Sequence, residues 1–157
     1  IQPRFRNHPA ISCGTSLRMT VCLDTNVLLQ IFGRHQPFYP ILRALLDGRI
    51  TLAVSNEILF EYQEVITRLS GAERWRDIAA LLDLLTQLHG NIHRVEPQFR
   101  FNVISTDVDD NKFCDCAIAA EADFIITEDN HFEILRAAGY KPRPIAPEKF
   151  VRQFFAA

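Results

Sequence analysis

The sequence predicts an α/β protein, a three-layer α/β/α sandwich in which a central parallel sheet lies between two layers of helices. Short apolar runs of strand length alternate along the chain with longer segments of helical period, the pattern of a parallel sheet covered on both faces. The chain has 157 residues, of which 48% are hydrophobic and 23% charged, so it can bury the core of one domain. No apolar run approaches the roughly 18 residues that cross a bilayer, and we expect no membrane partner.

The first part of the chain predicts a strand, a helix and a second strand. An apolar run predicts a buried strand over residues 20–23, directly before Asp24. Apolar side chains at helical spacing predict a helix over residues 37–47, which ends at Gly48 because glycine favours helix ends. A second apolar run predicts a strand over residues 50–54.

Two longer helices are expected next. Ser55 is a good capping residue for a helix over residues 56–69. The next periodic segment predicts a helix over residues 72–89 that ends at Gly90. A short strand follows over residues 92–95.

The last third of the chain continues the alternation. We expect a helix over residues 109–121, a buried strand over 124–126 and a helix over 130–138. A short strand near residues 144–145 and a helix over residues 147–155 complete the chain. No repeat or linker interrupts residues 19–157, which we assign to a single domain.

Residues 1–18 follow neither helical nor strand periodicity. The chain begins with Ile1, its only methionine is Met19, and the first 18 residues carry three arginines and no acid. We interpret this segment as an upstream extension or an expression remnant. A basic arm that binds nucleic acid is the alternative.

The four cysteines indicate a reducing compartment, and we expect a cytoplasmic protein. Cys114 and Cys116 lie two residues apart, which places them on opposite faces of a helix. They cannot hold one metal ion together, and we expect them to be buried as small apolar side chains.

Charge is distributed unevenly along the chain. The formal net charge of −2 argues at first against a protein that binds nucleic acid. Residues 107–133, however, contain nine acidic residues and one basic residue, Lys112. The rest of residues 19–157 holds 13 basic and 10 acidic residues, a net charge of +3. One short stretch therefore makes the protein acidic, and the rest of residues 19–157 is mildly basic.

Four acids are expected at one edge of the sheet, because ligands of such sheets bind beyond the carboxyl ends of the strands. Asp24 directly follows the first strand, and Asp129 lies three residues after the strand at 124–126. Asp110 begins the helix that leads into that strand. Glu61 lies at the margin of the apolar stripe of its helix. That stripe is expected to consist of Ile58, Tyr62, Val65 and Leu69.

Such carboxylates repel one another unless cations neutralise them. Mg²⁺ or Mn²⁺ fits best, because no histidine or cysteine is expected beside the acids. One or two such ions can activate a water and stabilise in-line attack on a phosphodiester. Lys112, His35 and several arginines are candidate phosphate contacts.

The same acids have simpler interpretations. Asp24 and Asp129 can end strands as turn residues, and Asp109 or Asp110 can cap a helix. Glu61 can be a solvated helix residue. These interpretations do not explain why acids recur at the same end of the sheet.

Several segments resemble the PIN-domain family, from about Met19 to Phe150. The matching segments are VCLDTNVLL, VSNEILFEYQEVITRL, DVDDNKFCDCAIAAEADFIITEDNHF and PIAPEKF. The chain is most similar to the bacterial branch assigned as toxin components of toxin–antitoxin pairs. The resemblance implies a parallel sheet sandwiched by helices, in agreement with the pattern above.

The resemblance also implies a metal-dependent ribonuclease with an acidic quartet. The quartet falls on Asp24, Glu61, Asp110 and Asp129, as catalytic residues and ligands of one or two Mg²⁺ or Mn²⁺ ions. Asn26 and Thr127 match polar positions that assist the site in relatives.

The third acid has close competitors. Val108 stands where this branch often has proline, and Asp107, Asp109 and Asp115 are near Asp110. Asp115 lies about 140° round the helix from Asp110, so the two are not expected to hold one ion. Asp110 ranks first and Asp115 second.

The resemblance implies RNA as substrate, a small antitoxin protein as partner and a possible homodimer. Two other functions stay open: an RNA-processing nuclease that is not a toxin, and a binding module that kept the fold and lost catalysis. A phosphatase of the haloacid-dehalogenase type is set aside, because Asn26 stands where such enzymes need a second acid.

Overall fold

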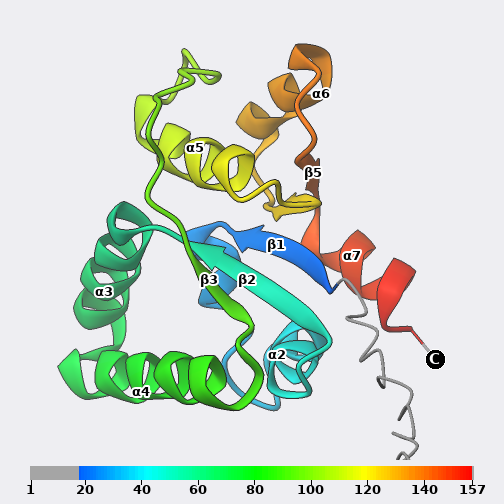
Figure 1. Cartoon of the computed structure of the whole chain (residues 1–157). Helices are drawn as coiled ribbons and strands as arrows, with labels where there is room; N and C mark the ends of the chain where they lie inside the picture. Colours follow the sequence, from blue (N-terminus) through cyan, green and yellow to red (C-terminus); the bar gives the residue numbers. More distant parts are fainter. Residues whose placement is uncertain (1–17, 157) are drawn as a thin grey trace, which may run out of the picture.

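A five-stranded parallel sheet forms the centre of the molecule, as the computed structural model of residues 18–156 shows (Figure 1). The strand order is β3-β2-β1-β4-β5, and every neighbouring pair is parallel. The strands are β1 (Met19–Leu23), β2 (Ile50–Val54), β3 (Ile92–Arg94), β4 (Phe124–Ile126) and β5 (Arg143–Ile145). The predicted parallel sheet is confirmed.

Helices cover both faces of this sheet. In Figure 1, α2 and α4 lie on one side of the strands and α5 lies on the other. The α-helices are α1 (Thr25–Leu28), α2 (Tyr39–Leu46), α3 (Asn56–Ser70), α4 (Ala72–His89), α5 (Asn111–Ala119), α6 (Ile134–Ala138) and α7 (Pro147–Phe154). Two 3₁₀ turns, η1 (Val108–Asp110) and η2 (Asn130–Glu133), precede α5 and α6. The expected three-layer α/β/α sandwich is therefore confirmed.

The central strand places two segments side by side at the carboxyl edge of the sheet. Leu23 of β1 is in register with Ile126 of β4, and the Asp24 amide donates to the Ile126 carbonyl at 3.1 Å. The residues that follow these two strands, Asp24 and Thr127, are consequently neighbours. The amino ends of β1, β4 and β5 meet at the opposite edge.

Local sequence signals explain most element boundaries. The Ser55 hydroxyl accepts a hydrogen bond from the Ile58 amide at 3.3 Å and caps α3, as expected. Gly90 takes the left-handed conformation (φ 59°) that ends α4. Cys22, Cys114 and Cys116 are buried free thiols, in agreement with the predicted apolar role, whereas Cys13 lies outside the described residues.

Three details differ from the expectation. The four-residue helix α1 was not predicted, because it is too short to show a helical period. The buried face of α3 consists of Ile58, Tyr62 and Ile66, four residues apart, and Leu69 is 62% exposed. The predicted helix over 130–138 is divided into η2 and α6.

The leading segment, residues 1–17, lies outside the described part of the chain. Its interpretation as an extension, and the domain boundary at residue 19, stay predictions. Within residues 18–156, no helix is both long and apolar enough to cross a membrane.

Candidate functional site

Asp24 lies at the centre of the carboxyl edge and is fixed by the neighbouring strand. Only 8% of its surface is exposed, and it accepts a hydrogen bond from the Thr127 hydroxyl at 2.8 Å. The oxygen of that hydroxyl accepts a bond from the Asp129 amide at 3.0 Å. Thr127 therefore joins two of the four predicted acids, which fits the supporting position expected for it.

Burial and neighbouring charge both act on Asp24. Removal from water raises the pKa of its carboxyl, and the charges of Glu61 and Asp129 raise it further. Hydrogen bonds from Thr127 and from the Thr25 backbone favour the ionised form and partly offset this effect. Asp24 precedes α1 without capping it, because its side chain accepts no capping hydrogen bond from the helix amides beyond Thr25.

Glu61 is held by two partners at the edge of the site. The Thr25 hydroxyl donates to one of its carboxylate oxygens, and the Lys112 ammonium lies 2.9 Å from the other. Glu61 is thus not a freely solvated helix residue. Lys112, expected to contact phosphate, forms an ion pair with Glu61 in this structure.

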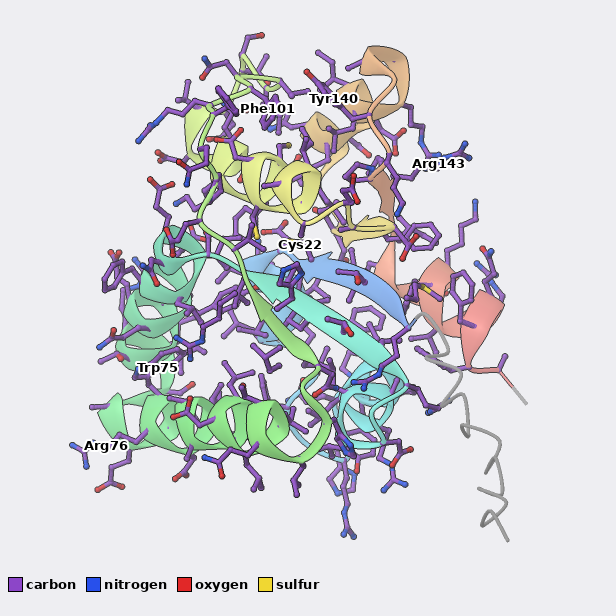
Figure 2. All side chains as sticks on the ribbon, in the orientation of Figure 1. Cys22, Trp75, Arg76, Phe101, Tyr140 and Arg143 are labelled. Carbon is purple, nitrogen blue, oxygen red and sulfur yellow. The ribbon has the colours of Figure 1, made fainter. Side chains whose placement is uncertain are left out.

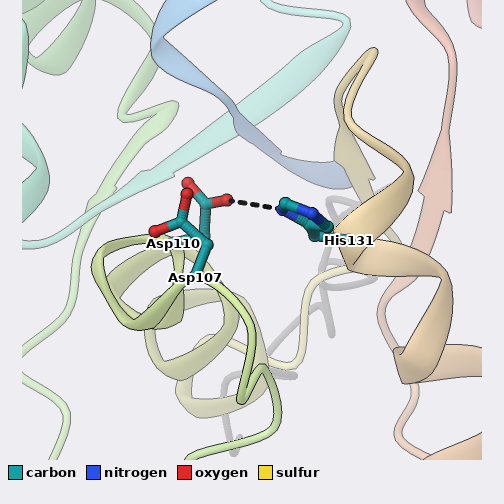
Figure 3. A group of neighbouring side chains, drawn as sticks. All are labelled: Asp107, Asp110 and His131. Atoms are coloured by element: carbon teal, nitrogen blue, oxygen red, sulfur yellow. Dashed lines mark ion pairs between the residues drawn. The ribbon is translucent and has the colours of Figure 1, made fainter.

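Asp110 lies beside Asp107, with His131 facing both (Figure 3). Its Oδ2 atom is buried and has no hydrogen-bond partner among the described residues. Burial, followed by the charges of Asp107, Asp24 and Asp129, raises the pKa of Asp110 to about 7. Such a group is costly for the fold, and a cation would relieve the cost.

Capping explains Asp107 and not Asp110. The Asp107 side chain accepts from the Asp109 amide at 3.2 Å and begins the turn η1. Asp110 precedes α5 without a side-chain capping bond. Its carboxylate is therefore free to face the other acids.

His131 belongs to the site, and the expectation that no histidine accompanies the acids is wrong. Its Nδ1 lies 3.4 Å from Asp129 Oδ1 and 4.0 Å from Asp110 Oδ2. The turn η2 causes this approach, since the His131 amide donates to Asp129 Oδ1 at 2.9 Å. The sequence signal is the spacing of two between Asp129 and His131, shortly after the strand that ends at Ile126.

Two further predicted residues do not join this group. Asp115 is buried and accepts from the Phe101 amide at 2.9 Å, beside a small hollow that Arg100 and Glu57 also line. Burial is the main reason that its pKa is raised. Asn26 is exposed, and its backbone carbonyl accepts from the Gln30 side chain at 2.9 Å, while its own side chain has no hydrogen bond to residues 18–156.

The arrangement suits a hard divalent cation. Asp107, Asp110 and His131 each offer one ligand atom, and these atoms lie within 4.8 Å of one another. Carboxylate oxygens are the donors that Mg²⁺ and Mn²⁺ prefer, and the unpartnered Asp110 Oδ2 provides a free donor atom. Asp24 and Asp129 contribute negative charge to the same place.

Comparison with known proteins agrees with this fold. No curated protein matches the chain. Among solved structures, the chain is similar to VapBC2 from Rickettsia felis, which was crystallised bound to a DNA fragment from their promoter. The identity is 21%, the TM-score is 0.53, and the match covers 81% of this chain and 99% of the other.

A family model described as the PIN domain matches residues 20–131, a range that contains all four predicted acids. Because this match covers well over half of the sequence, the chain belongs to the PIN-domain family.

Proposed function

We propose that this PIN domain is a divalent-metal-dependent endoribonuclease that hydrolyses RNA phosphodiesters. Asp24, Glu61, Asp110 and Asp129 are its catalytic and metal-binding residues. The observation that carries the proposal is the buried, unpartnered oxygen of Asp110, in a carboxyl whose pKa is raised to about 7 by burial and by neighbouring acids. Strongly shifted pKa values of this kind cluster at functional sites.

In this proposal the acidic residues attract the metal ion, and Thr127 orients one of them. Asp24, Asp110 and Asp129 hold the charge that attracts one or two ions of Mg²⁺ or Mn²⁺, with Asp107 and His131 beside them. When bound, such an ion supplies a Lewis acid that stabilises the charge developing on the phosphate. Thr127 fixes the orientation of Asp24.

Glu61 is held beside Asp24 through Thr25, the residue that follows Asp24 in the chain. The Thr25 hydroxyl and the Lys112 ammonium fix the orientation of its carboxylate. Each oxygen keeps a further lone pair that can orient a water or contribute to the ion site. Lys112 is 20% exposed and can also contact a phosphate oxygen that enters the site.

A cleavage assay tests the active site. The full chain is incubated with a labelled single-stranded RNA in Mn²⁺, and the rate is compared with that of Asp24→Asn. Loss of a ligand or its orientation is expected to lower the rate by about 100-fold or more. Asp83→Asn is the matched control, because Asp83 is an exposed acid on α4 paired with Arg94 at 3.4 Å. Equal rates for wild type and Asp24→Asn would remove the site and favour a binding module.

We further propose that the enzyme is the cytoplasmic toxin of a toxin–antitoxin pair, with a small antitoxin as partner and a homodimer as its assembly. The resemblance of the sequence segments to the toxin branch and the fold likeness to VapBC2 support this role. Cells that express the wild-type chain alone are expected to stop growing, and cells that express Asp24→Asn are expected to grow. Unharmed cells that contain active enzyme would contradict the toxin role and favour an RNA-processing nuclease.

A further inference from the structure

A groove of about 940 Å³ lies at the amino ends of the strands, at the opposite edge of the sheet from the carboxylates. The beginnings of β1 and β4, the whole of β5 and residues of α6 and α7 line it. Figure 2 labels Arg143 beside β5, on the side of the molecule where this groove lies. No residue of the predicted site lines it.

The groove is positively charged. Its acids are Glu121 and Asp123, and its lysines and arginines are Arg18, Arg136, Lys141, Arg143 and Lys149. The lining therefore has a formal charge of +3, although the chain as a whole has −2. The groove is therefore a positively charged region on a protein whose net charge is negative.

Some of these cations are engaged by the protein and others are not. Arg136 donates to Glu133 at 2.8 Å and to the Pro144 carbonyl at 2.6 Å, and Lys141 lies 3.7 Å from Asp123. Arg143 and Lys149 are exposed, and within residues 18–156 neither has an acidic partner. Their charges are available to a ligand.

The lining of the groove also contains aromatic rings. Phe124 and Phe154 both line it, and their ring centroids are 5.6 Å apart. Both rings are partly exposed. Both also pack against the core, so each ring offers only its accessible part to a ligand. Aromatic rings beside cations are found in surfaces that bind single-stranded nucleic acid, where bases stack and phosphates pair with lysine and arginine. An acidic peptide would use the cations and not the rings.

We propose that this groove, which we call the amino-end groove, binds the phosphate backbone of the same RNA strand that the carboxylates cleave. This inference rests on the proposed nuclease function. The sheet separates the two sites by about 16 Å, the length of the five-residue strand β1 at about 3.3 Å per residue. Only an RNA longer than a few nucleotides can reach both, so the amino-end groove favours long substrates over short ones.

Binding in EDTA tests the groove without requiring cleavage. The full chain is titrated into a fluorescent single-stranded RNA of about 16 nucleotides, the upper range of one single-strand binding site, and anisotropy is measured at several salt concentrations. The double variant Arg143→Gln/Lys149→Gln is expected to bind at least about tenfold more weakly, because each lost phosphate contact costs affinity. Its slope of log affinity against log salt should fall by about 1.4, since each contact to a single strand contributes about 0.7.

The matched control is Arg68→Gln/Arg76→Gln, which removes two exposed arginines outside the groove. Arg68 lies at the end of α3, and Arg76 lies on α4, far from Arg143 (Figure 2). Equal loss of affinity in the two double variants would overturn the proposal. Tighter binding of a polyglutamate peptide than of RNA, dependent on Arg143 and Lys149, would also overturn it in favour of a protein partner.

The outcome also separates this proposal from the proposed function. RNA binding that depends on the groove, without cleavage in Mn²⁺, would support the groove and contradict the nuclease. Cleavage of long RNA at equal rates by wild type and Arg143→Gln/Lys149→Gln, with equal binding, would overturn the groove alone.

Discussion

The two edges of the sheet carry opposite charge in different environments. At the carboxyl edge, Asp24 is 8% exposed and Asp110 has a buried oxygen without a partner. At the amino edge, Arg143 and Lys149 extend into solvent around an open groove. Both edges belong to the same short strands, so the difference comes from the residues that follow or precede each strand.

The charges at the carboxyl edge destabilise the folded state, whereas those at the amino edge affect it little. Buried like charges oppose folding, because each loses hydration and repels the others. Lysine and arginine at an open surface keep their charged ends in water and cost little. We therefore expect changes at the carboxyl edge to alter stability and catalysis together, and changes at the amino edge to alter RNA binding alone.

The largest effect is expected for Asp110→Asn. With Mn²⁺, RNA cleavage should fall by about 100-fold or more, because the site loses a charged ligand. In EDTA the melting temperature should rise by a few degrees, since the substitution removes one charge from a crowded, buried group. The measurements are cleavage kinetics and thermal unfolding followed by circular dichroism. Arg143→Gln/Lys149→Gln should leave the melting temperature unchanged, and an equal rise in both variants would erase the contrast between the two edges.

The second largest effect is expected from metal addition, which should stabilise the folded protein through the carboxyl edge. A ligand that binds only the folded state at 100 times its Kd stabilises it by about 2.7 kcal/mol. Mn²⁺ at that concentration should therefore raise the melting temperature of the wild-type chain by several degrees and that of Asp110→Asn by much less. Scanning calorimetry with Mn²⁺ or EDTA measures this, and Asp83→Asn is the control with an equal change of charge. A shift of the same size in Asp110→Asn would place the ion elsewhere.

Thr127→Val tests the link between neighbouring strands. The substitution keeps the shape of the side chain and removes the hydroxyl that donates to Asp24 and accepts from the Asp129 amide. Cleavage is expected to fall by about tenfold, the lower end of effects seen when a group orienting a metal ligand is lost. Thr86→Val is a suitable control, because that hydroxyl donates within α4, to the Leu82 carbonyl at 2.8 Å, away from the acids. An unchanged rate would show that Asp24 needs no orientation by Thr127.

The sequence predicts the fold well, because most of its signals are local. Strands β1, β2 and β4 correspond to apolar runs, and Ser55 and Gly90 mark helix ends by their own conformational preferences. The helix α1 was missed because four residues cannot show a period of 3.6. Leu69 continues the apolar stripe of its helix in the sequence and was therefore predicted to be buried. It is exposed in the structure, because the last turn of a helix need not lie over the sheet.

The two edges differ in how far they could be predicted. The order of the acids at the carboxyl edge follows from the topology of parallel strands, so Asp24, Glu61, Asp110 and Asp129 could be named together. The contribution of Thr25 depends on contact with a residue 36 positions away, which no local pattern indicates. The amino-end groove gathers cations from Arg18 to Lys149 that share no motif, and only the folded chain brings them together.

The smallest expected effect is the dependence of stability on pH in the absence of metal. Because the pKa of Asp110 is raised to about 7 in the folded chain, that chain keeps a proton that the unfolded chain releases near pH 4. The free energy of unfolding should consequently decrease as the pH rises from about 4 to about 7, by an amount on the order of 1 kcal/mol after allowance for solvent screening. Urea unfolding in EDTA across this range measures the slope.

Asp110→Asn should reduce that slope, and Arg143→Gln/Lys149→Gln should retain it. The slope should not vanish entirely in Asp110→Asn, because burial also raises the pKa of Asp24. Addition of Mn²⁺ should reverse the trend, since ions bind the deprotonated carboxylates and gain affinity as the pH rises. Identical slopes in wild type and Asp110→Asn would mean that Asp110 is solvated like the groove cations, and the contrast between the two edges would then rest on Asp24 alone.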